Sequence, residues 1–243
     1  MRLIFVAIIL GLSAIIAFWL AAAAFKYKAK SMETIVVTGL AEKDFISDLI
    51  VWNGSYSRKA MDLKSAYAAV KQDENMIRNY LVSKGIAENE MIFSSVVITK
   101  DFESRTNENG RQMEQVFSGY NLTQTVKVES ANVDKIDKIS RQVTELIESG
   151  IEFNSSPPLY YNTKLSEVKM DLLARASADA RARAETIAKN SGSTLGKLRK
   201  ASMGIFQITG KNSNEDYSYG GAFNTSSRNK TGSITIRMEF SAE

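Results

Sequence analysis

Serine and lysine residues in the second half of the chain have the spacing of a serine acylase site. Ser166 and Lys169 fit S-x-x-K, residues 227–229 fit S-x-N, and residues 230–232 fit K-T-G. Enzymes with these three patterns use a serine nucleophile that a lysine assists. Here S-x-N and K-T-G are contiguous, so no element lies between them to place three groups around one pocket. We therefore interpret Ser166 as a helix-start residue and residues 230–232 as a turn.

The chain contains neither cysteine nor histidine. It therefore cannot form a disulfide framework, a thiolate nucleophile, a zinc site of the usual nitrogen and sulfur type, or a histidine-based triad. We expect no catalytic residue, no metal and no cofactor, and we predict that the protein is not an enzyme.

Periodicity divides the chain after its first 30 residues into strands and three helices. A two-residue period or β-branched composition predicts strands at 33–39, 46–57, 91–100, 116–128, 198–209 and 233–241. Apolar residues at three- and four-residue spacing predict helices at 63–85, 133–150 and 165–190. In the third helix the expected buried stripe is Val168, Leu172, Ala176, Ala180, Ala184, Ile187 and Ala188.

A short extended segment is expected at 151–161, around the only two prolines of the chain. This order of elements predicts an α+β fold with mixed or antiparallel sheets packed against about three helices. No linker rich in proline, glycine or serine divides residues 31–243, so we expect them to form one domain.

The first residues form an unbroken apolar run of 23 residues from Leu3 to Phe25. A helix of that length reaches across the ~30 Å hydrocarbon core of a bilayer. We therefore predict a membrane anchor with a basic juxtamembrane segment at 1–30 and an extracytoplasmic domain at 31–243. A cleaved signal peptide is the alternative, since residues 21–24 are all alanine and supply a cleavage site. The protein would then be secreted or periplasmic.

Charge is unevenly distributed along the chain. The whole sequence has 31 Lys+Arg and 27 Asp+Glu, but four of the basic residues and no acidic ones lie in the first 30 positions. The remaining residues are electrically balanced. Such a domain has no broad basic surface for phosphate backbones, so we do not expect it to bind nucleic acid.

Three segments carry a resemblance to a known family. Val36-Val37-Thr38-Gly39, followed by Asp48, is similar to an opening V-x-G-x-G…P-D motif, although Ala41 and Ser47 replace its second glycine and its proline. Residues 119–128 (GYNLTQTVKV) resemble a G-Y-x-x-x-Q-x-V-x-V strand. The most specific match is A-R-x-R-A-E at 180–185, continued by Ile187-Ala188, Gly192 and Leu195-Gly196.

Together these motifs resemble the SIMPL domain family, also called DUF541, over about residues 33 to 241. The resemblance implies an α+β domain in secreted or envelope-anchored bacterial proteins. It also implies homo-oligomers and links to stress tolerance for some members, and no established catalytic residue.

Two sets of residues are candidates for contacts with another copy or a partner. Arg181 and Glu185 lie four apart on the third predicted helix, which predicts a surface ion pair or an intersubunit salt bridge. The polar segment 211–230 is long for a connection between strands and contains Tyr217, Tyr219 and Phe223. It is either disordered or ordered by contact with a partner. On the second strand, Trp52 and Tyr56 share a face and are expected in the core.

Three functions follow from these features. The first is a membrane-anchored, non-catalytic assembly or scaffold protein outside the cytoplasm, homo-oligomeric and linked to envelope stress tolerance. The second is a binding module for an envelope ligand or partner. The third, a hydrolase of the serine–lysine type, rests only on the short patterns around Ser166.

Overall fold

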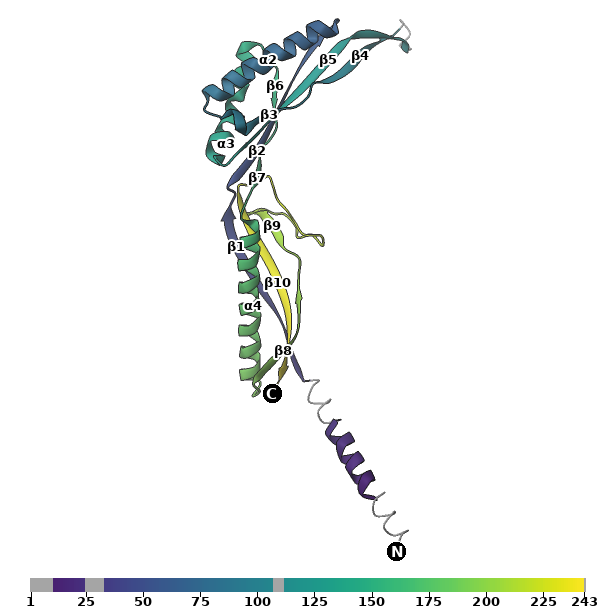
Figure 1. Ribbon diagram of the computed structural model, residues 1–243, viewed down its shortest axis with the longest axis vertical. Coiled ribbons are helices and arrows are strands. Elements are labelled where there is room, and N and C mark those ends of the chain that lie inside the picture. Colours follow the sequence, from purple (N-terminus) through teal and green to yellow (C-terminus); the bar gives the residue numbers. More distant parts are fainter. Residues whose placement is uncertain (1–10, 25–32, 107–111, 243) are drawn as a thin grey trace.

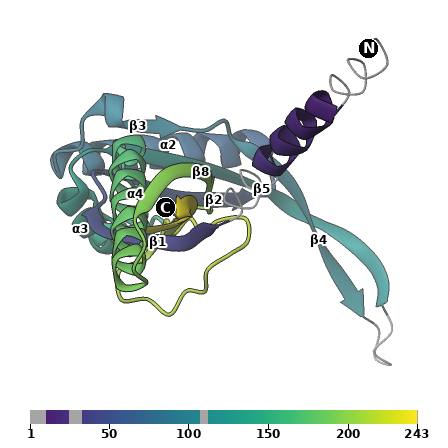
Figure 2. The ribbon, with the colours of Figure 1, turned by 90° about the horizontal axis from the view of Figure 1, so that it is seen from below.

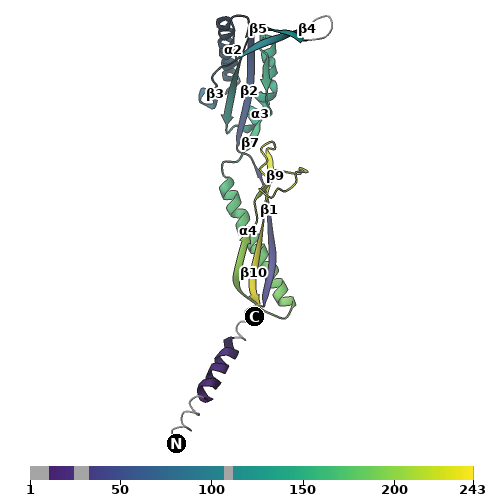
Figure 3. The same cartoon turned by 90° about the vertical axis from the view of Figure 1, so that its right-hand side faces the viewer.

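A computed structural model describes residues 11–24, 33–106 and 112–242 of the chain. These residues form an elongated α+β molecule with two antiparallel sheets, which confirms the predicted fold class (Figure 1). We call β1, β8, β9, β10 and α4 the lower lobe, and β2 to β7 with α2 and α3 the upper lobe. The two lobes lie one above the other along the long axis (Figure 3).

The lower lobe is a narrow antiparallel sheet covered on one face by a long helix. Strand β1 (Thr34–Ile46) pairs over its whole length with β10 (Asn229–Ala242). On its other side β10 pairs with β8 (Leu195–Met203) and β9 (Gln207–Gly210). Helix α4 (Leu165–Asn190) lies over β1 and β10. Within the described residues, the opposite face of this sheet, which we call the open face, is not covered by a helix (Figure 1).

The upper lobe is built around two long strands, β2 (Leu49–Ala60) and β5 (Gln112–Ser130). Strand β5 also pairs with β3 (Met91–Phe93) and β4 (Val97–Thr106), whereas β2 also pairs with β6 (Phe153–Ser155) and β7 (Leu159–Tyr161). Helices α2 (Leu63–Ser83) and α3 (Val133–Gln142) pack on this sheet, and short 3-10 helices cover 88–90 and 143–149. Trp52 and Tyr56 lie in its core, as predicted.

Contact between α4 and β1 depends on the absence of a side chain at Gly39. A Cβ atom there would lie 2.2 Å from the backbone oxygen of Ala176 and 2.6 Å from the backbone nitrogen of Ala180. The buried alanines of α4 and the bare Cα of Gly39 thus let helix and strand backbones approach closely. In addition, Asp179 accepts a hydrogen bond from the backbone N–H of Leu40 at 2.9 Å.

The connection between the lobes, which we call the neck, consists of Ser47 and Asp48 between β1 and β2. The Asp48 carboxylate accepts hydrogen bonds from the backbone N–H and the hydroxyl of Thr163, both at 2.7 Å. Since Thr163 lies two residues before α4, this contact ties the start of the helix to the segment that follows β1. Arg228 and Asp134 form an ion pair that joins the lower lobe to α3.

Several predicted elements differ from the structure. The strands expected at 91–100 and 198–209 are each broken in two, into β3 and β4 and into β8 and β9. The second predicted helix ends as α3 at Gln142 and continues as a 3-10 helix, so Ile147 is exposed. Ile187 was expected in the buried stripe of α4 but is 47% exposed, because it extends past the edge of β1. Residues 230–232 belong to β10 and not to a turn.

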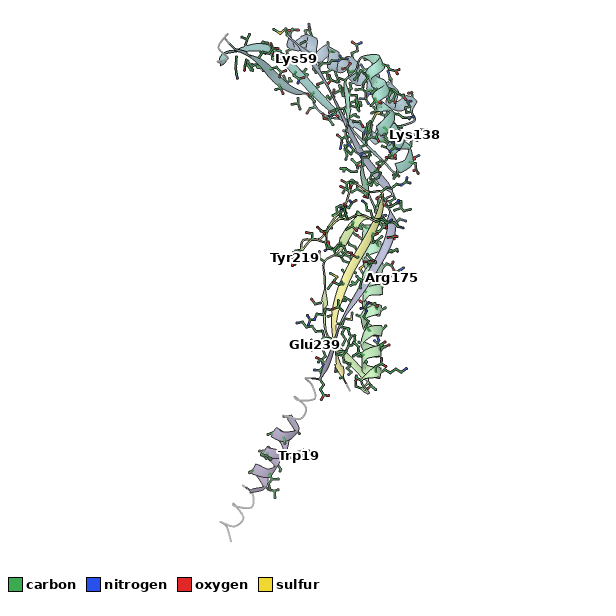
Figure 4. The ribbon with its side chains drawn as sticks, turned by 180° about the vertical axis from the view of Figure 1, so that it is seen from behind. Trp19, Lys59, Lys138, Arg175, Tyr219 and Glu239 are labelled. Atoms are coloured by element: carbon green, nitrogen blue, oxygen red, sulfur yellow. The ribbon has the colours of Figure 1, made fainter. Side chains whose placement is uncertain are left out.

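The predicted anchor lies only partly in the described residues. Residues 11–24 form an exposed helix, and Trp19 on this helix lies apart from the two lobes in Figure 4. Leu3 and Phe25, which bound the predicted anchor, lie outside the described residues. Of the helices that the described ranges contain, none is long and apolar enough to cross a membrane.

Replacing Gly39 by alanine is expected to lower the free energy of unfolding by about 1–3 kcal/mol, because the new methyl group meets helix backbone that cannot move aside. Urea denaturation measures the change. Gly220→Ala is the matched control, since a Cβ there meets only the Ser218 hydroxyl at 3.9 Å. Equal stability of the two variants would contradict the close packing of α4 on β1.

Asp48 gives the neck a dependence on pH. Burial by itself raises the pKa of this carboxyl, but the hydrogen bonds from Thr163 outweigh burial and hold the pKa below its ordinary value of 3.8. A lowered pKa means that this stabilisation is present above about pH 4 and is lost as the pH falls through the lowered pKa. Asp48→Asn should therefore lower the free energy of unfolding by about 1 kcal/mol at pH 7.

The difference between Asp48→Asn and the wild type should shrink toward zero as denaturation is repeated at lower pH. The control is Asp216→Asn, a change on the exposed loop for which no effect is expected at any pH. A difference that is constant from pH 7 to pH 2 would show that the charge of Asp48 does not hold the neck.

Candidate functional site

The segment after β9 folds back over the open face of the lower lobe and forms a cavity there. Tyr217 and Tyr219 line this cavity with Leu40, Ile205 and neighbouring residues, and its volume is about 230 Å³. Leu40 comes from β1, whereas Ser233, Ile234 and Thr235 come from β10, so the floor is the sheet itself. Two of the three aromatic residues that the sequence singled out therefore lie at one site.

Gln207 on β9 holds the loop in place with its side chain. Its amide nitrogen donates to the carbonyl of Ser218 at 2.9 Å. Its amide oxygen accepts from the backbone N–H of Ala222 at 2.7 Å and from that of Ser218 at 3.2 Å. One side chain thus satisfies three backbone groups on the two sides of Tyr219, at Ser218 and Ala222.

A second set of contacts fixes the end of the loop. Glu215 accepts hydrogen bonds from the backbone N–H of Gly210 and from the side-chain amide of Asn224. Lys230 is buried, and its Nζ donates to the carbonyls of Asn224 and Ser227, each at 2.6 Å. Burial lowers the pKa of Lys230 to about 8, and the charge of Glu215 opposes that shift. Through these hydrogen bonds, Lys230 fixes the position of residues 224–227 at the end of the loop.

The lining of the cavity is uncharged. Its polar groups are hydroxyls and the amide of Gln207, and its remaining surface comes from aromatic rings and aliphatic side chains. The hydroxyl of Ser233 donates to that of Tyr217 at 3.2 Å, which orients the ring over the sheet. Tyr219 is 100% exposed and extends away from the body of the molecule (Figure 4). This arrangement suits the binding of a small neutral group more than proton transfer.

The other predicted contact residues lie elsewhere. Phe223 forms an isolated backbone bridge with Ile208 and is not part of the cavity lining. Arg181 and Glu185 form the predicted ion pair on the outer surface of α4, at 2.9 Å, with side chains that are 69% and 54% exposed. In the described residues the pair is a surface ion pair within one helix, and it does not contact the loop.

A buried polar network in the upper lobe was not predicted from the sequence. Gln124 accepts a hydrogen bond from the hydroxyl of Tyr56 at 2.7 Å and donates to Glu74 at 3.0 Å. Next to it, Arg58 makes two hydrogen bonds to the buried carboxylate of Asp73, at 2.6 and 2.9 Å. Burial raises the pKa of Glu74, but contacts with Lys71, Gln124 and Arg78 lower it overall. Since the polar groups of this network form hydrogen bonds with one another, we assign the network a structural role in the upper lobe.

The residues of the serine–lysine patterns have separate surroundings in the structure. Ser166 is exposed in the first turn of α4, in agreement with its interpretation as a helix-start residue. The Nζ of Lys169 lies 5.4 Å from the centre of the Phe206 ring, whereas the Nζ of Lys230 donates to the carbonyl of Asn224 in the loop. The carboxylates of the described ranges contain no group of three or more that could hold a metal ion.

The three segments that carry the resemblance have physical roles in the structure. Gly39 lies directly against Ala176 and Ala180 of α4, where a Cβ atom would collide with helix backbone. Gly119 adopts a positive φ of 129° at an irregularity in the pairing of β4 with β5, and Gln124 joins the buried network. Arg183 pairs with Asp179 at 2.8 Å, which in turn caps the N–H of Leu40.

Comparison with known proteins agrees with these motifs. A family model, SIMPL, described as a protein of unknown function (DUF541), matches residues 35–243. A search among curated proteins gives no match. Because the matched residues include both lobes and all three motifs, the chain belongs to the SIMPL (DUF541) family.

Proposed function

We propose that the protein is a non-catalytic assembly protein, tethered to a membrane by Leu3–Phe25 and located outside the cytoplasm. The apolar run and the cysteine-free, balanced domain support this location. A secreted or periplasmic form after cleavage is the alternative. The family resemblance adds links to envelope stress tolerance. Homo-oligomerisation is the part of the proposal for which the structure offers a surface.

The observation that carries the assembly proposal is a two-stranded arm formed by β4 and β5. Strand β2 ends opposite Tyr120, and beyond this point β5 pairs only with β4. The resulting ribbon projects from the body of the molecule (Figure 2). Because an isolated hairpin is marginally stable in water, a ribbon of this kind gains most by packing against another molecule.

Apolar side chains along β4 face solvent on this arm. Phe102 is 53% exposed, and Val97 and Ile98 near the base of the arm are also exposed. Phe102 contacts Phe117 edge to face, with ring centres 5.9 Å apart, and Phe117 contacts Tyr120 in the same way. The aromatic cluster stiffens the ribbon and also presents an apolar surface, which favours contact with a second copy.

Phe102→Glu is expected to weaken self-association of the full chain in detergent by at least about tenfold, because a charge would be buried in the proposed contact. Sedimentation velocity over a range of concentrations measures the effect. Met170→Glu is the matched control, since Met170 is also exposed but lies on α4, far from the arm. A wild-type chain that remains monomeric at all concentrations would disprove the proposal.

A second candidate function is a binding module, and the cavity at Tyr217 and Tyr219 favours it. Since Gln207 and Lys230 hold the loop, the two rings are presented on a preorganised surface. Binding would use the rings and the hydroxyls around them.

Tyr217→Ser combined with Tyr219→Ser should abolish capture of an envelope component while leaving the thermal midpoint within about 2 °C of the wild type, because both rings are largely exposed. Chemical crosslinking in envelope extracts, followed by mass spectrometry, compares the two proteins. The control is Phe223→Ser, which removes an exposed ring outside the cavity. Unchanged capture by the double variant would exclude the cavity as the binding site.

A further inference from the structure

At the end of the loop, Lys230 and Glu215 lie on two sides of the side-chain amide of Asn224. The Nζ of Lys230 is 3.2 Å from the Oδ1 of Asn224. On the other side of the same amide, the Nδ2 of Asn224 donates to a carboxylate oxygen of Glu215. Lys230 is only 2% exposed and Asn224 only 8% exposed. An amine and a carboxamide are thus in contact away from water, with a carboxylate beside them.

Hydrogen bonds hold the amine of Lys230 in the orientation of a nucleophile. Its Nζ donates to the backbone carbonyls of Asn224 and Ser227, each at 2.6 Å, whereas the contact with the Asn224 side chain is longer. A neutral amine has two N–H bonds and one lone pair, so the two short hydrogen bonds use both of its protons. The third direction, toward the side-chain amide of Asn224, is then that of the lone pair.

Burial also keeps a part of this amine neutral. The pKa of Lys230 is lowered from 10.5 to about 8 by burial, against the charge of Glu215. A lysine that is desolvated in this way is an activated nucleophile, because the neutral amine and not the ammonium group attacks a carbonyl carbon. About one Lys230 side chain in ten is therefore neutral at pH 7, and about half are neutral at pH 8.

A backbone N–H is placed where negative charge develops during such an attack. Addition of the amine to the Cγ of Asn224 moves charge onto Oδ1. The backbone N–H of Ser227 already donates to this oxygen at 2.8 Å. A fixed donor at that position stabilises the tetrahedral intermediate, as in an oxyanion hole. The backbone of Asn224 is itself fixed, since its N–H donates to the carbonyl of Ile208 at 2.8 Å.

Glu215 contacts the nitrogen that has to leave. One of its carboxylate oxygens accepts from the Nδ2 of Asn224, and the other accepts from the backbone N–H of Gly210 at 3.0 Å. These two contacts fix the carboxylate beside the amide. The Nδ2 leaves as ammonia only after it gains a proton. A carboxylate in this place can take a proton from the attacking nitrogen and deliver it to the leaving nitrogen.

We propose that Lys230 and Asn224 form an intramolecular isopeptide bond, with Glu215 as the acid–base group. The lone pair of Nζ attacks the Cγ of Asn224, a C–N bond to Nζ forms, and the C–N bond to Nδ2 breaks. Glu215 moves one proton from Nζ to Nδ2. The products are a secondary amide between the two side chains and one molecule of ammonia, so atoms and charges balance without any other reactant.

The bond closes a covalent ring over residues 224–230, in a chain that has no cysteine for a disulfide. Arg228 lies within this ring. Its side chain pairs with Asp134 in the upper lobe, and its carbonyl accepts a hydrogen bond from the N–H of Ser47 in the neck. The cross-link therefore fixes the segment through which the loop reaches the upper lobe. It depends neither on the arm nor on binding at the cavity.

Mass spectrometry of a tryptic digest tests for the bond, because trypsin cuts after Arg228, inside the ring. The full chain in detergent is digested after one day at pH 8. With the bond in place, residues 212–228 stay joined to residues 229–237, since a modified Lys230 is not a cleavage site. This branched species should be lighter than the two peptides together by about 17 Da, the mass of one ammonia. Without the bond, residues 212–228 are released as a linear peptide.

Three variants identify the reacting groups. Lys230→Met and Asn224→Ala should give none of the branched species, because each lacks one of the two side chains that join. Glu215→Gln keeps the size of the side chain but not its basicity, so the branched species should decrease at least about tenfold. Asp216→Asn is the matched control, since it changes the neighbouring carboxylate on the exposed loop and should react like the wild type.

Two results would overturn the proposal. The first is a wild-type digest that contains residues 212–228 only as a linear peptide, whether at full mass or lighter by one ammonia through ring closure at Asn224. The second is an equal amount of the branched species in a Glu215→Gln variant that has the circular dichroism of the wild type.

Discussion

The close approach of α4 to β1 at Gly39 sets the geometry of the lower lobe. At Gly39 the strand lacks a side chain, so the alanine-rich face of the helix approaches its backbone closely. That contact fixes the position of α4 along β1, so Asp179 meets the N–H of Leu40 and the second half of the helix runs beside the strand edge. The position of the groove that Val36 and Thr38 line together with α4 thus follows from how α4 packs on β1.

The open face is organised by polar contacts and not by a helix. Gln207 and Lys230 hold the loop over the sheet, and Arg228 at the end of the loop reaches Asp134 in the upper lobe. The same segment therefore builds the cavity around Tyr217 and joins the two lobes. The backbone N–H of Ser47 in the neck also donates to the carbonyl of Arg228 at 3.0 Å, so the end of the loop contacts the neck.

The sequence predicted those elements whose pattern is dictated by one buried face. Helix α4 has the predicted bounds, because its buried residues recur at four-residue spacing from Val168 to Ala188, and β10 alternates as expected. Irregular pairing was not predictable, since the break between β8 and β9 follows from their separate register with β10. Ile187 was misplaced because helical periodicity identifies a face but not where the facing sheet ends. Ile147 was misplaced because the helix becomes a 3-10 helix after Gln142, which changes the period.

At the candidate site, the aromatic residues were predicted but the groups that position them were not. Tyr217 and Tyr219 stand out because they interrupt a polar segment. Gln207 and Glu215 have no such signal, because a polar side chain that binds distant backbone resembles any solvated residue in sequence. Lys230 was interpreted as a turn residue, although its place in a strand with alternating burial could have indicated a buried ammonium group.

The first and last described strands begin and end together, with the N–H of Ala242 bonded to the carbonyl of Glu33. The start of β1 and the end of β10 therefore lie together at the bottom of the lower lobe, and the arm lies at the top of the molecule (Figure 1). Strands β1 and β2 together have 25 residues, so at about 3.3 Å per residue they span up to roughly 80 Å. The combined length of β1 and β2 therefore sets the distance between the bottom of the lower lobe and the arm.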